Sequence, residues 1–272
     1  MTAVTPVEPI PRDLPSRIGP IDGLRQSMTL AWRTLVQIRH NPWELGDFSF
    51  QPILFVLLFT YVFGGAIGGS PAAYLTITLP GLIVMNMFFV TMYVGMGLNT
   101  DLTKGVFDRL RSLPIARWAP LAGRIAADMV KQAWSFALLL AVGYVLGFRI
   151  ETSIFGLLGA VALVLVFALA FSWVSVLVGV VAKDPEHVQL FGFTALFPIT
   201  FISNVFAPAD TMPGWLQPIV ENNPVSVLAD ACRGLMVTGA EAQPIITSLI
   251  WAAGIAVVFS FLAVRALRRK AG

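Results

Sequence analysis

Charged residues are scarce in this sequence. Only 12% of the 272 residues are Asp, Glu, Lys or Arg, while 57% are hydrophobic and the mean hydropathy is +0.79. Water-soluble domains carry about 25% charged residues and about 45–50% apolar ones. The composition therefore excludes a soluble globular protein, and its high apolar content also excludes a chain that is disordered throughout.

Cysteine and histidine are rarer still. Cys232 is the only cysteine, so neither an intramolecular disulfide nor a cysteine-based metal cluster can form. The two histidines, His40 and His187, are far apart, and no G-x-x-x-x-G-K-[ST] loop for ATP phosphates occurs. We therefore expect no metal, no cofactor and no catalytic residue on this chain. The net charge of +3 does not indicate nucleic-acid binding, because the basic residues lie between apolar segments.

Six long stretches are nearly or wholly free of charged residues. Each has about 18 residues or more, which is the length that an α-helix needs to cross a bilayer. None shows the alternation of a membrane β-strand. The sequence therefore predicts an all-α polytopic membrane protein with six transmembrane helices in one domain, 42–272. The spans are expected at about 48–69, 75–99, 131–148, 154–182, 188–209 and 243–264. Their lack of ionisable residues argues against an ion-coupled transporter.

The basic residues predict the orientation of these spans. With six crossings, 16 of the 18 Lys and Arg residues fall on one side, and only Arg149 and Arg233 fall on the other. Because cytoplasmic segments carry the excess of Lys and Arg, both termini are expected in the cytoplasm. Residues 1–20 are proline-rich and lack the apolar core of a signal peptide, which predicts a disordered cytoplasmic tail.

Residues 21–41 predict an amphipathic helix ahead of the first span. Leu24, Met28 and Ala31 recur at helical spacing, whereas Arg25 falls on another face. A helix of this kind lies in the cytoplasmic interface of the membrane. Two interpretations remain open: the helix contacts a cytoplasmic partner, or it only stabilises the first span.

The most polar internal segment is the loop 101–124, between the second and third spans. Acidic and basic residues are mixed there with apolar ones, and Gly105 and Pro114 bracket a short helical stretch. Either these charges pair with a partner protein across an interface, or the loop only supplies the positive charge that fixes the topology.

The outer segment 210–241 contains two short predicted helices, at 213–220 and 224–237. Asn223 stands at the N-cap of the second helix and Pro224 at its first position. Both helices are too short to cross a bilayer, and both have apolar faces. They dip into the outer leaflet, pack as a lid, or belong to a plain extracellular loop.

Mildly polar residues in the spans are accompanied by Met and Phe. Asn86 lies between Met85 and Phe89, and Asn204 follows a run of phenylalanines. Met and Phe adapt to large apolar ligands, although such residues also serve in ordinary helix packing and lipid contact.

The loop after the second span also carries a family resemblance. Its segments Asn99-Thr100-Asp101, Lys104-Gly105-Val106-Phe107-Asp108-Arg109 and Arg111-Ser112-Leu113-Pro114-Ile115 resemble the type-2 ABC exporter permeases, in particular the drug-efflux branch of daunorubicin and doxorubicin resistance permeases. The resemblance extends over residues 28–270. One departure is that related permeases often carry a glutamate-rich triad in this loop, where this chain has Asp101, Lys104 and Asp108.

The resemblance implies a permease that works with other chains and with membrane lipid. Two permease chains, identical or paralogous, would each bind a separate ATP-binding subunit that holds ATP and Mg. The ATPase-coupling interface would comprise Arg25, Arg33, Asp101, Lys104, Gly105, Asp108, Arg109 and Arg111. The substrate path would include Asn86, Phe89, Phe197, Phe201 and Asn204, and the outer gate Trp215, Pro224 and Leu228.

The sequence thus favours the membrane subunit of an ATP-driven exporter of lipophilic drugs or antibiotic-like molecules of the anthracycline kind. A lipid or glycolipid exporter fits the same apolar interior. An ATP-independent channel or secondary transporter is less well supported, because neither charged midplane residues nor an obvious repeat is present. A membrane-embedded enzyme would need a catalytic cluster that the sequence does not offer.

Overall fold

The computed structural model describes residues 19–40, 42–106, 115–116 and 118–270, and within these ranges all regular structure is helical. The predicted tail 1–20 falls almost entirely outside them. The elements are α1 (Pro20–His40), α2 (Pro42–Leu58), the π-helix η1 (Phe59–Phe63), α3 (Gly64–Ile67), α4 (Pro71–Thr103), α6 (Ala119–Val145), α7 (Ile154–Val181), α8 (Pro185–Phe201), the 3-10 helix η2 (Ala209–Thr211), α9 (Gln217–Glu221), α10 (Pro224–Arg233), the π-helix η3 (Gly234–Thr238) and α11 (Ala242–Lys270).

Among the residues that the structure describes, five helical segments are long and apolar enough to cross a membrane. They are Ser49–Ile67, Pro71–Thr103, Ala119–Val145, Ile154–Val181 and Ala242–Arg269. The all-helical, polytopic architecture expected from the sequence is confirmed. The fifth predicted span, 188–209, is not among the five, because α8 has 17 residues and is about 26 Å long against a bilayer core of about 30 Å.

Helix α8 ends at Phe201, where the side chain of Asn223 donates hydrogen bonds to backbone carbonyls that have no partner within the helix. Asn223 donates from Nδ2 to the carbonyl oxygens of Ile199 and Ile202, at 2.7 and 2.6 Å. Ile202 has left the helical region, with φ −87° and ψ 54°. The last carbonyls of a helix have no partner within it, so this contact satisfies them and fixes the bend.

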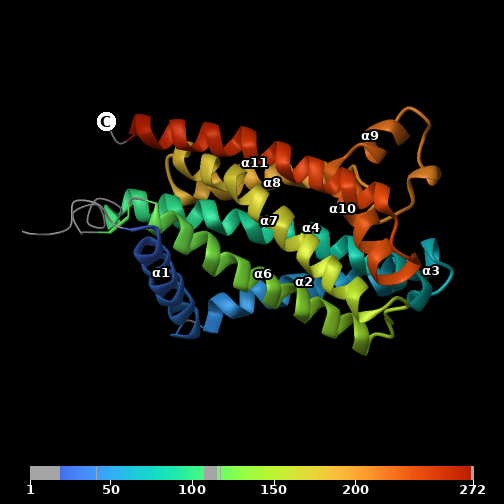
Figure 1. The fold of residues 1–272 in the computed structure, drawn as a ribbon. Helices are drawn as coiled ribbons and strands as arrows, with labels where there is room; N and C mark the ends of the chain where they lie inside the picture. The colour runs from blue at the N-terminus through green and yellow to red at the C-terminus, as the bar shows by residue number, and fades with distance from the viewer. Residues whose placement is uncertain (1–18, 41, 107–114, 117, 271–272) are drawn as a thin grey trace, which may run out of the picture.

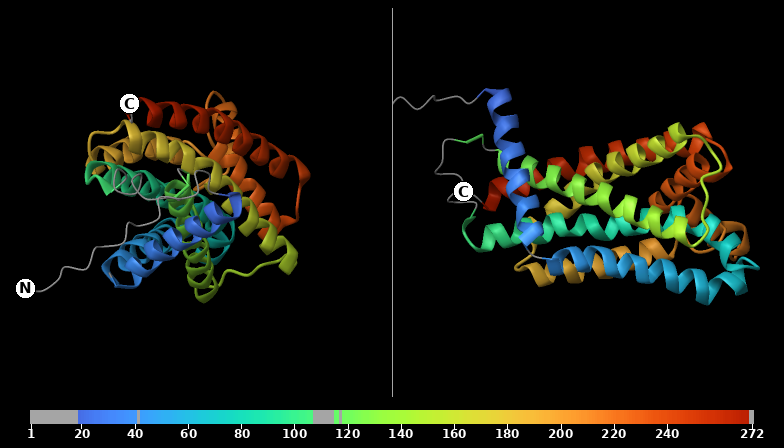
Figure 2. Two further views of the ribbon diagram at one scale, coloured as in Figure 1. Left: turned by 60° about the vertical axis from the view of Figure 1, so that its left-hand side comes forward. Right: turned by 90° about the horizontal axis from the view of Figure 1, so that it is seen from below.

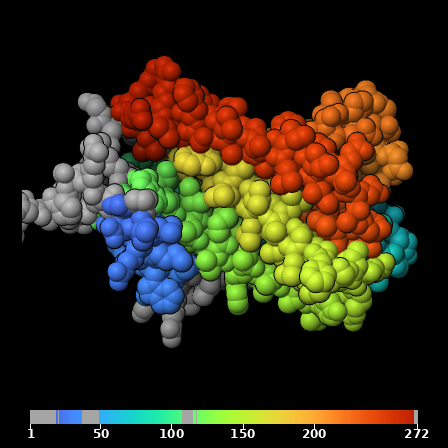
Figure 3. All heavy atoms as spheres, in the orientation of Figure 1, coloured from blue at the N-terminus to red at the C-terminus, as the bar shows by residue number. Residues whose placement is uncertain are grey.

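Helix α4 is the centre of the bundle (Figure 1). It packs against α6, α7, α8 and α10, and 78% of the most apolar window of this helix is buried. The corresponding share of α11 is only 11%. In the space-filling view α11 forms an exposed ridge along one edge, and the segment around α9 projects at the end away from the C-terminus (Figure 3).

Glycine permits the closest approach in the bundle, where α4 crosses α7. A Cβ on Gly179 would overlap the carbonyl oxygen of Gly95, so only glycine fits there. The Gly95 N–H donates to Ser175 Oγ at 2.9 Å, and Ser175 in turn donates to the Met92 carbonyl at 3.3 Å. This crossing, with small residues and an interhelical hydrogen bond, is typical of membrane helix pairs.

Helix α1 lies across one end of the bundle, roughly perpendicular to the long helices (Figure 2). Small residues form the face of α1 that packs on α6. Gly23, Ser27 and Ala31 are buried, whereas Leu24 and Met28 are 64% and 68% exposed. The reason is that α6 approaches closely, and a Cβ on Gly123 would lie 2.7 Å from the Ser27 carbonyl oxygen.

Helix α6 begins 12 residues before the predicted third span, 131–148, and ends at Val145. It therefore includes Arg124, Asp128 and Lys131, so this helix is not confined to the uncharged stretch. Lys131 Nζ lies 3.7 Å from Asp128 Oδ1. Within a helix such charges are tolerated when they pair with each other.

Candidate functional site

The bundle end that carries α1 holds the described part of the predicted coupling interface. Arg25 and Arg33 are exposed on α1, and Lys104 is exposed at the C-cap of α4. Gly105 follows with φ +66°, the left-handed conformation in which glycine ends helices. Three further predicted residues, Asp108, Arg109 and Arg111, lie outside the described residues.

Asp101 differs from its neighbours because it is paired within the chain. Its Oδ2 forms an ion pair and hydrogen bond with Arg124 on α6. The guanidinium lies over Gly97, one turn earlier on α4, where a Cβ would overlap it. Sequence reasoning missed Arg124, because nothing in the helical periodicity links it to a residue 23 positions earlier.

The end of the loop that leads into α6 packs against α1. The backbone N–H of Ala116 donates to Gln26 Oε1 at 2.9 Å. The ring of Trp118 packs over Gly23, where a Cβ would come within 2.5 Å of it. These contacts join α1, the loop's end and the first turn of α6 into one packed unit.

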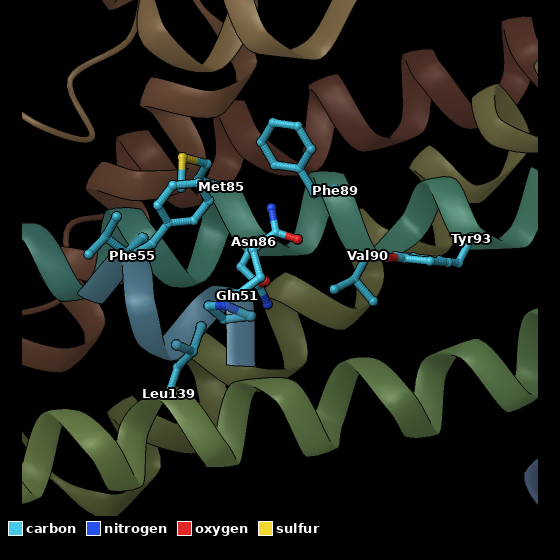
Figure 4. Close-up of a pocket in the computed structure, with 10 residues that line it drawn as sticks. Gln51, Phe55, Met85, Asn86, Phe89, Val90, Tyr93 and Leu139 are labelled. Carbon is cyan, nitrogen blue, oxygen red and sulfur yellow. The ribbon is translucent and has the colours of Figure 1, made fainter. Parts of the chain in front are cut away.

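A pocket lies between α2, α4 and α6 in the middle of the bundle. It brings together two predicted path residues, Asn86 and Phe89, with the carboxamide of Gln51 from α2. Asn86 donates from Nδ2 to Ser135 Oγ on α6 at 2.6 Å. Figure 4 shows Gln51 and Asn86 near the middle of the pocket, with Phe55 and Met85 towards one end and Tyr93 at the other. The remaining lining is apolar: Pro52, Leu82, Val90 and Leu139.

Aromatic rings continue from this pocket along α8. Phe89 contacts Phe193, with ring centroids 5.8 Å apart. One turn further along α8, Phe197 and Phe201 stack at 4.1 Å, and both are partly exposed. Phe201 then contacts Phe206, which stacks on Phe59 at 4.4 Å. Three of the predicted path residues therefore lie on one row of aromatic side chains.

Asn204, the fifth predicted path residue, belongs to a polar cluster at the end of the bundle opposite α1. Its Nδ2 donates to Asp230 Oδ2 at 2.8 Å, and its backbone N–H donates to Ser226 Oγ at 3.1 Å. Asp230 is also paired with Arg233, whose Nε donates to the Ile77 carbonyl at 3.0 Å. These bonds tie α10 to the end of α8 and to α4, so Asn204 serves the packing of this chain.

The predicted gate residues have different surroundings. Trp215 is 73% exposed, Pro224 is the first residue of α10 and half-buried, and Leu228 is fully buried in the core. Cys232, also on α10, is buried, and loss of hydration raises the pKa of its thiol to about 12. Helix α10 is thus embedded in the bundle over most of its length.

These arrangements offer a binding surface rather than a reaction centre. Among the residues that the structure describes, no three His, Cys, Asp or Glu side chains are placed to hold a metal ion. The pocket is small, with a cavity volume of about 30 Å³, and its lining combines aromatic faces with carboxamide groups. The exposed basic residues Arg25, Arg33 and Lys104 lie at the bundle end that carries α1.

Comparison with known proteins identifies the family. The ABC-2 type transporter model matches residues 25–237. A daunorubicin resistance ABC transporter permease of Streptomyces coeruleorubidus is 40% identical over 90% of this chain and 86% of its own length. A probable doxorubicin resistance ABC transporter permease of Mycobacterium tuberculosis is 30% identical over 61% of this chain and 60% of its own length. An inner membrane transport permease of Escherichia coli is 24% identical over 76% of this chain and 80% of its own length. The chain therefore belongs to the ABC-2 type transporter family.

Proposed function

We propose that this chain is the membrane subunit of an ATP-driven exporter that moves lipophilic, anthracycline-like drugs out of the cell. The observation that carries this proposal is the row of partly exposed aromatic rings that runs from Phe89 along α8, in a chain whose relatives are named for resistance to daunorubicin and doxorubicin. Flat aromatic drugs stack on phenylalanine rings, and their polar edges hydrogen-bond with carboxamides.

The path supports this substrate class through its chemistry. Phe89, Phe197 and Phe201 present partly exposed rings, and Gln51 and Asn86 line the same pocket as Phe89. Asn204 would act on the path indirectly, by holding the end of α8 through its hydrogen bond to Asp230. Binding energy for a large apolar substrate comes mainly from burial of its surface, and the few polar groups orient it.

The proposed topology has six crossings with both termini in the cytoplasm of a bacterial cell. Helix α1 and the C-terminal end of α11 lie at the same end of the bundle (Figure 1). A chain that starts and ends on one side crosses the membrane an even number of times. The five membrane-length helices therefore need α8 as the sixth crossing, continued by residues 202–208.

The energy source of the proposed exporter is a separate ATP-binding subunit, present in two copies with ATP and Mg, bound to a pair of permease chains. Its contacts on this chain would be the charged groups at the α1 end, among them Arg25, Arg33 and Lys104, with Gly105 and the loop residues Asp108, Arg109 and Arg111. ATP closure would then favour a state with lower affinity for the drug, since only a difference in affinity between the two states drives release. Pro224 and Leu228 on α10, with Trp215, would form the outer gate.

A transport assay with a matched pair of variants tests the substrate path. The exporter, reconstituted with its ATP-binding subunit in inverted vesicles, should accumulate doxorubicin when ATP is added. Phe89→Ala removes one ring from the pocket, and KM for the drug should rise about tenfold. Phe261→Ala is the control, because this ring on α11 is 66% exposed and far from the pocket in sequence.

Equal KM values for the two variants would contradict the path. If ATP hydrolysis continues and a labelled phospholipid moves instead of doxorubicin, the cargo is lipid and the drug assignment is wrong.

A further inference from the structure

Helix α4 joins the cytoplasmic end of the chain to the pocket. Asp101 is near its last turn, and Phe89 lies 12 residues earlier, about 18 Å along the helix axis. Any movement that starts in α1 or the loop must reach α4 to change the pocket. A contact between these elements and α4 must therefore transmit this movement.

Helix α1 reaches α4 chiefly through α6. Its main packing partner is α6, along the face formed by Gly23, Ser27 and Ala31. The bond from Ala116 to Gln26 adds the end of the loop to the same unit. A displacement of α1 therefore moves the first turns of α6.

The Asp101–Arg124 ion pair joins those first turns of α6 to α4. The missing side chain of Gly97 leaves the room in which the guanidinium lies. The two side chains are 30% and 20% exposed, and ion pairs with this much solvent contact contribute little to folding stability. This arrangement therefore fixes the position of the guanidinium and adds little to the free energy of unfolding.

On the side away from α6, α4 is hydrogen-bonded to α7 close to Asp101. Asn99 donates from Nδ2 to the carbonyl oxygens of Gly179 and Ala182, both at 2.9 Å. With the Gly95–Gly179 crossing one turn away, α4 and α7 move together. The ion pair is thus a polar link between a unit made of α1 and α6 and a unit made of α4 and α7, placed at the first turns of α6, whereas the second such link, from Asn86 to Ser135, lies at the pocket.

We propose that Arg124 and Asp101 are positioning residues that couple the ATP-driven displacement of α1 and the loop to α4. This inference rests on the proposed function, and it reassigns Asp101 from contact with the ATP-binding subunit to transmission within the chain. Loss of the pair leaves the ATP-binding subunit attached but lowers the amount of substrate moved per ATP hydrolysed.

The experiment compares variants in the full complex, reconstituted in vesicles. Asp101→Asn and Arg124→Gln each remove one charge, and the double variant removes both. The exchanged variant, Asp101→Arg with Arg124→Asp, restores the attraction with reversed polarity. Gly97→Ala displaces the guanidinium without changing any charge, and Gly254→Ala is its control, since a Cβ at Gly254 meets open space. Co-purification of the ATP-binding subunit, the ATPase rate and doxorubicin transport are measured on each sample.

We expect both single variants to keep the ATP-binding subunit while transport per ATP falls about 2- to 30-fold. The double variant should be no worse than either single variant, because both remove one interaction. The exchanged variant should recover part of the loss, and Gly97→Ala should show a loss that Gly254→Ala does not.

Two results would overturn the inference while leaving the proposed function intact. In the first, every variant transports as much drug per ATP as the wild type. In the second, Asp101→Asn loses the ATP-binding subunit and Arg124→Gln keeps it, which would make Asp101 a docking contact. A wild-type chain that binds no ATP-binding subunit would instead refute the proposed function, and this inference with it. Variants that fail to fold are recognised by aggregation on size-exclusion chromatography, and Gly97→Ala then decides.

Discussion

Asn223 holds together the bend between α8 and α10, and replacing it should open this part of the chain. Its Oδ1 accepts from the Val225 N–H at 2.9 Å and caps α10, while its Nδ2 donates to the carbonyls of Ile199 and Ile202. Asn223 itself is only 8% exposed. Asn223→Ala removes all three hydrogen bonds and leaves the two carbonyls without this donor.

The size of the effect follows from these bonds. Loss of an N-cap costs about 1 kcal/mol, and each further lost hydrogen bond in a buried site costs about 1 kcal/mol or more. The local opening of α10 should therefore become easier by about 3 kcal/mol. Since every 1.4 kcal/mol is a factor of ten, the open population should rise about 100-fold.

Cys232 reports this opening without any added label site. It is the only cysteine, lies buried on the same helix and has a thiol pKa raised to about 12, so the closed state reacts very slowly with maleimide at pH 7.5. The labelling rate in detergent should rise about 100-fold in Asn223→Ala. Asn222→Ala is the matched control, because Asn222 is exposed and its side chain bonds only to Pro218 within the same helix end. Equal labelling rates in the two variants would refute this role of Asn223.

Two further predictions concern other parts of the bundle. Gly179→Leu should lower the free energy of unfolding by about 1–3 kcal/mol or more, because the leucine side chain would overlap the backbone of Gly95. Thermal unfolding in detergent measures this loss, with Gly254→Leu as the control. Equal melting temperatures of the two variants would contradict the tight crossing. Asp184 caps α8 by accepting from the His187 N–H, which lowers the pKa of its carboxyl below 3.8. Its contribution to stability is therefore complete above pH 3.8 and lost as the pH falls through the lowered pKa. Amide exchange at the start of α8 should speed up in that range in the wild type but not in Asp184→Asn, and the same pH response in both proteins would exclude the carboxyl as the cause.

Much of the fold follows from local signals in the sequence. Long uncharged stretches predicted the membrane-length helices. An α-helix in lipid satisfies its own backbone hydrogen bonds, so its side chains need only be apolar. Asn223 and Pro224 predicted the start of α10 from capping chemistry alone. The end of α8 was not predictable in this way because it depends on Asn223, and the partner of Arg124 on α6 was not predictable because it is Asp101 in another helix.

The candidate site shows the same division. Asn86 and Phe89 were selected from the family resemblance, and the structure places both on α4 in the lining of one pocket. Composition could not distinguish Asp101, which is paired inside the chain, from exposed Lys104 three residues later. The packed face of α1 was missed for a related reason: the large apolar residues that mark amphipathic helices are exposed here, and small residues permit the close contact with α6.

The central claim is that ATP hydrolysis by a partner subunit drives drug export through this chain. The most direct test is to purify the tagged chain from native membranes, reconstitute it with the ATP-binding subunit that accompanies it, and follow doxorubicin uptake into inverted vesicles. We predict uptake that requires hydrolysable ATP and stops when the ATP-binding subunit is inactivated. Uptake that proceeds equally without ATP, or ATP hydrolysis with no drug movement, would contradict the claim.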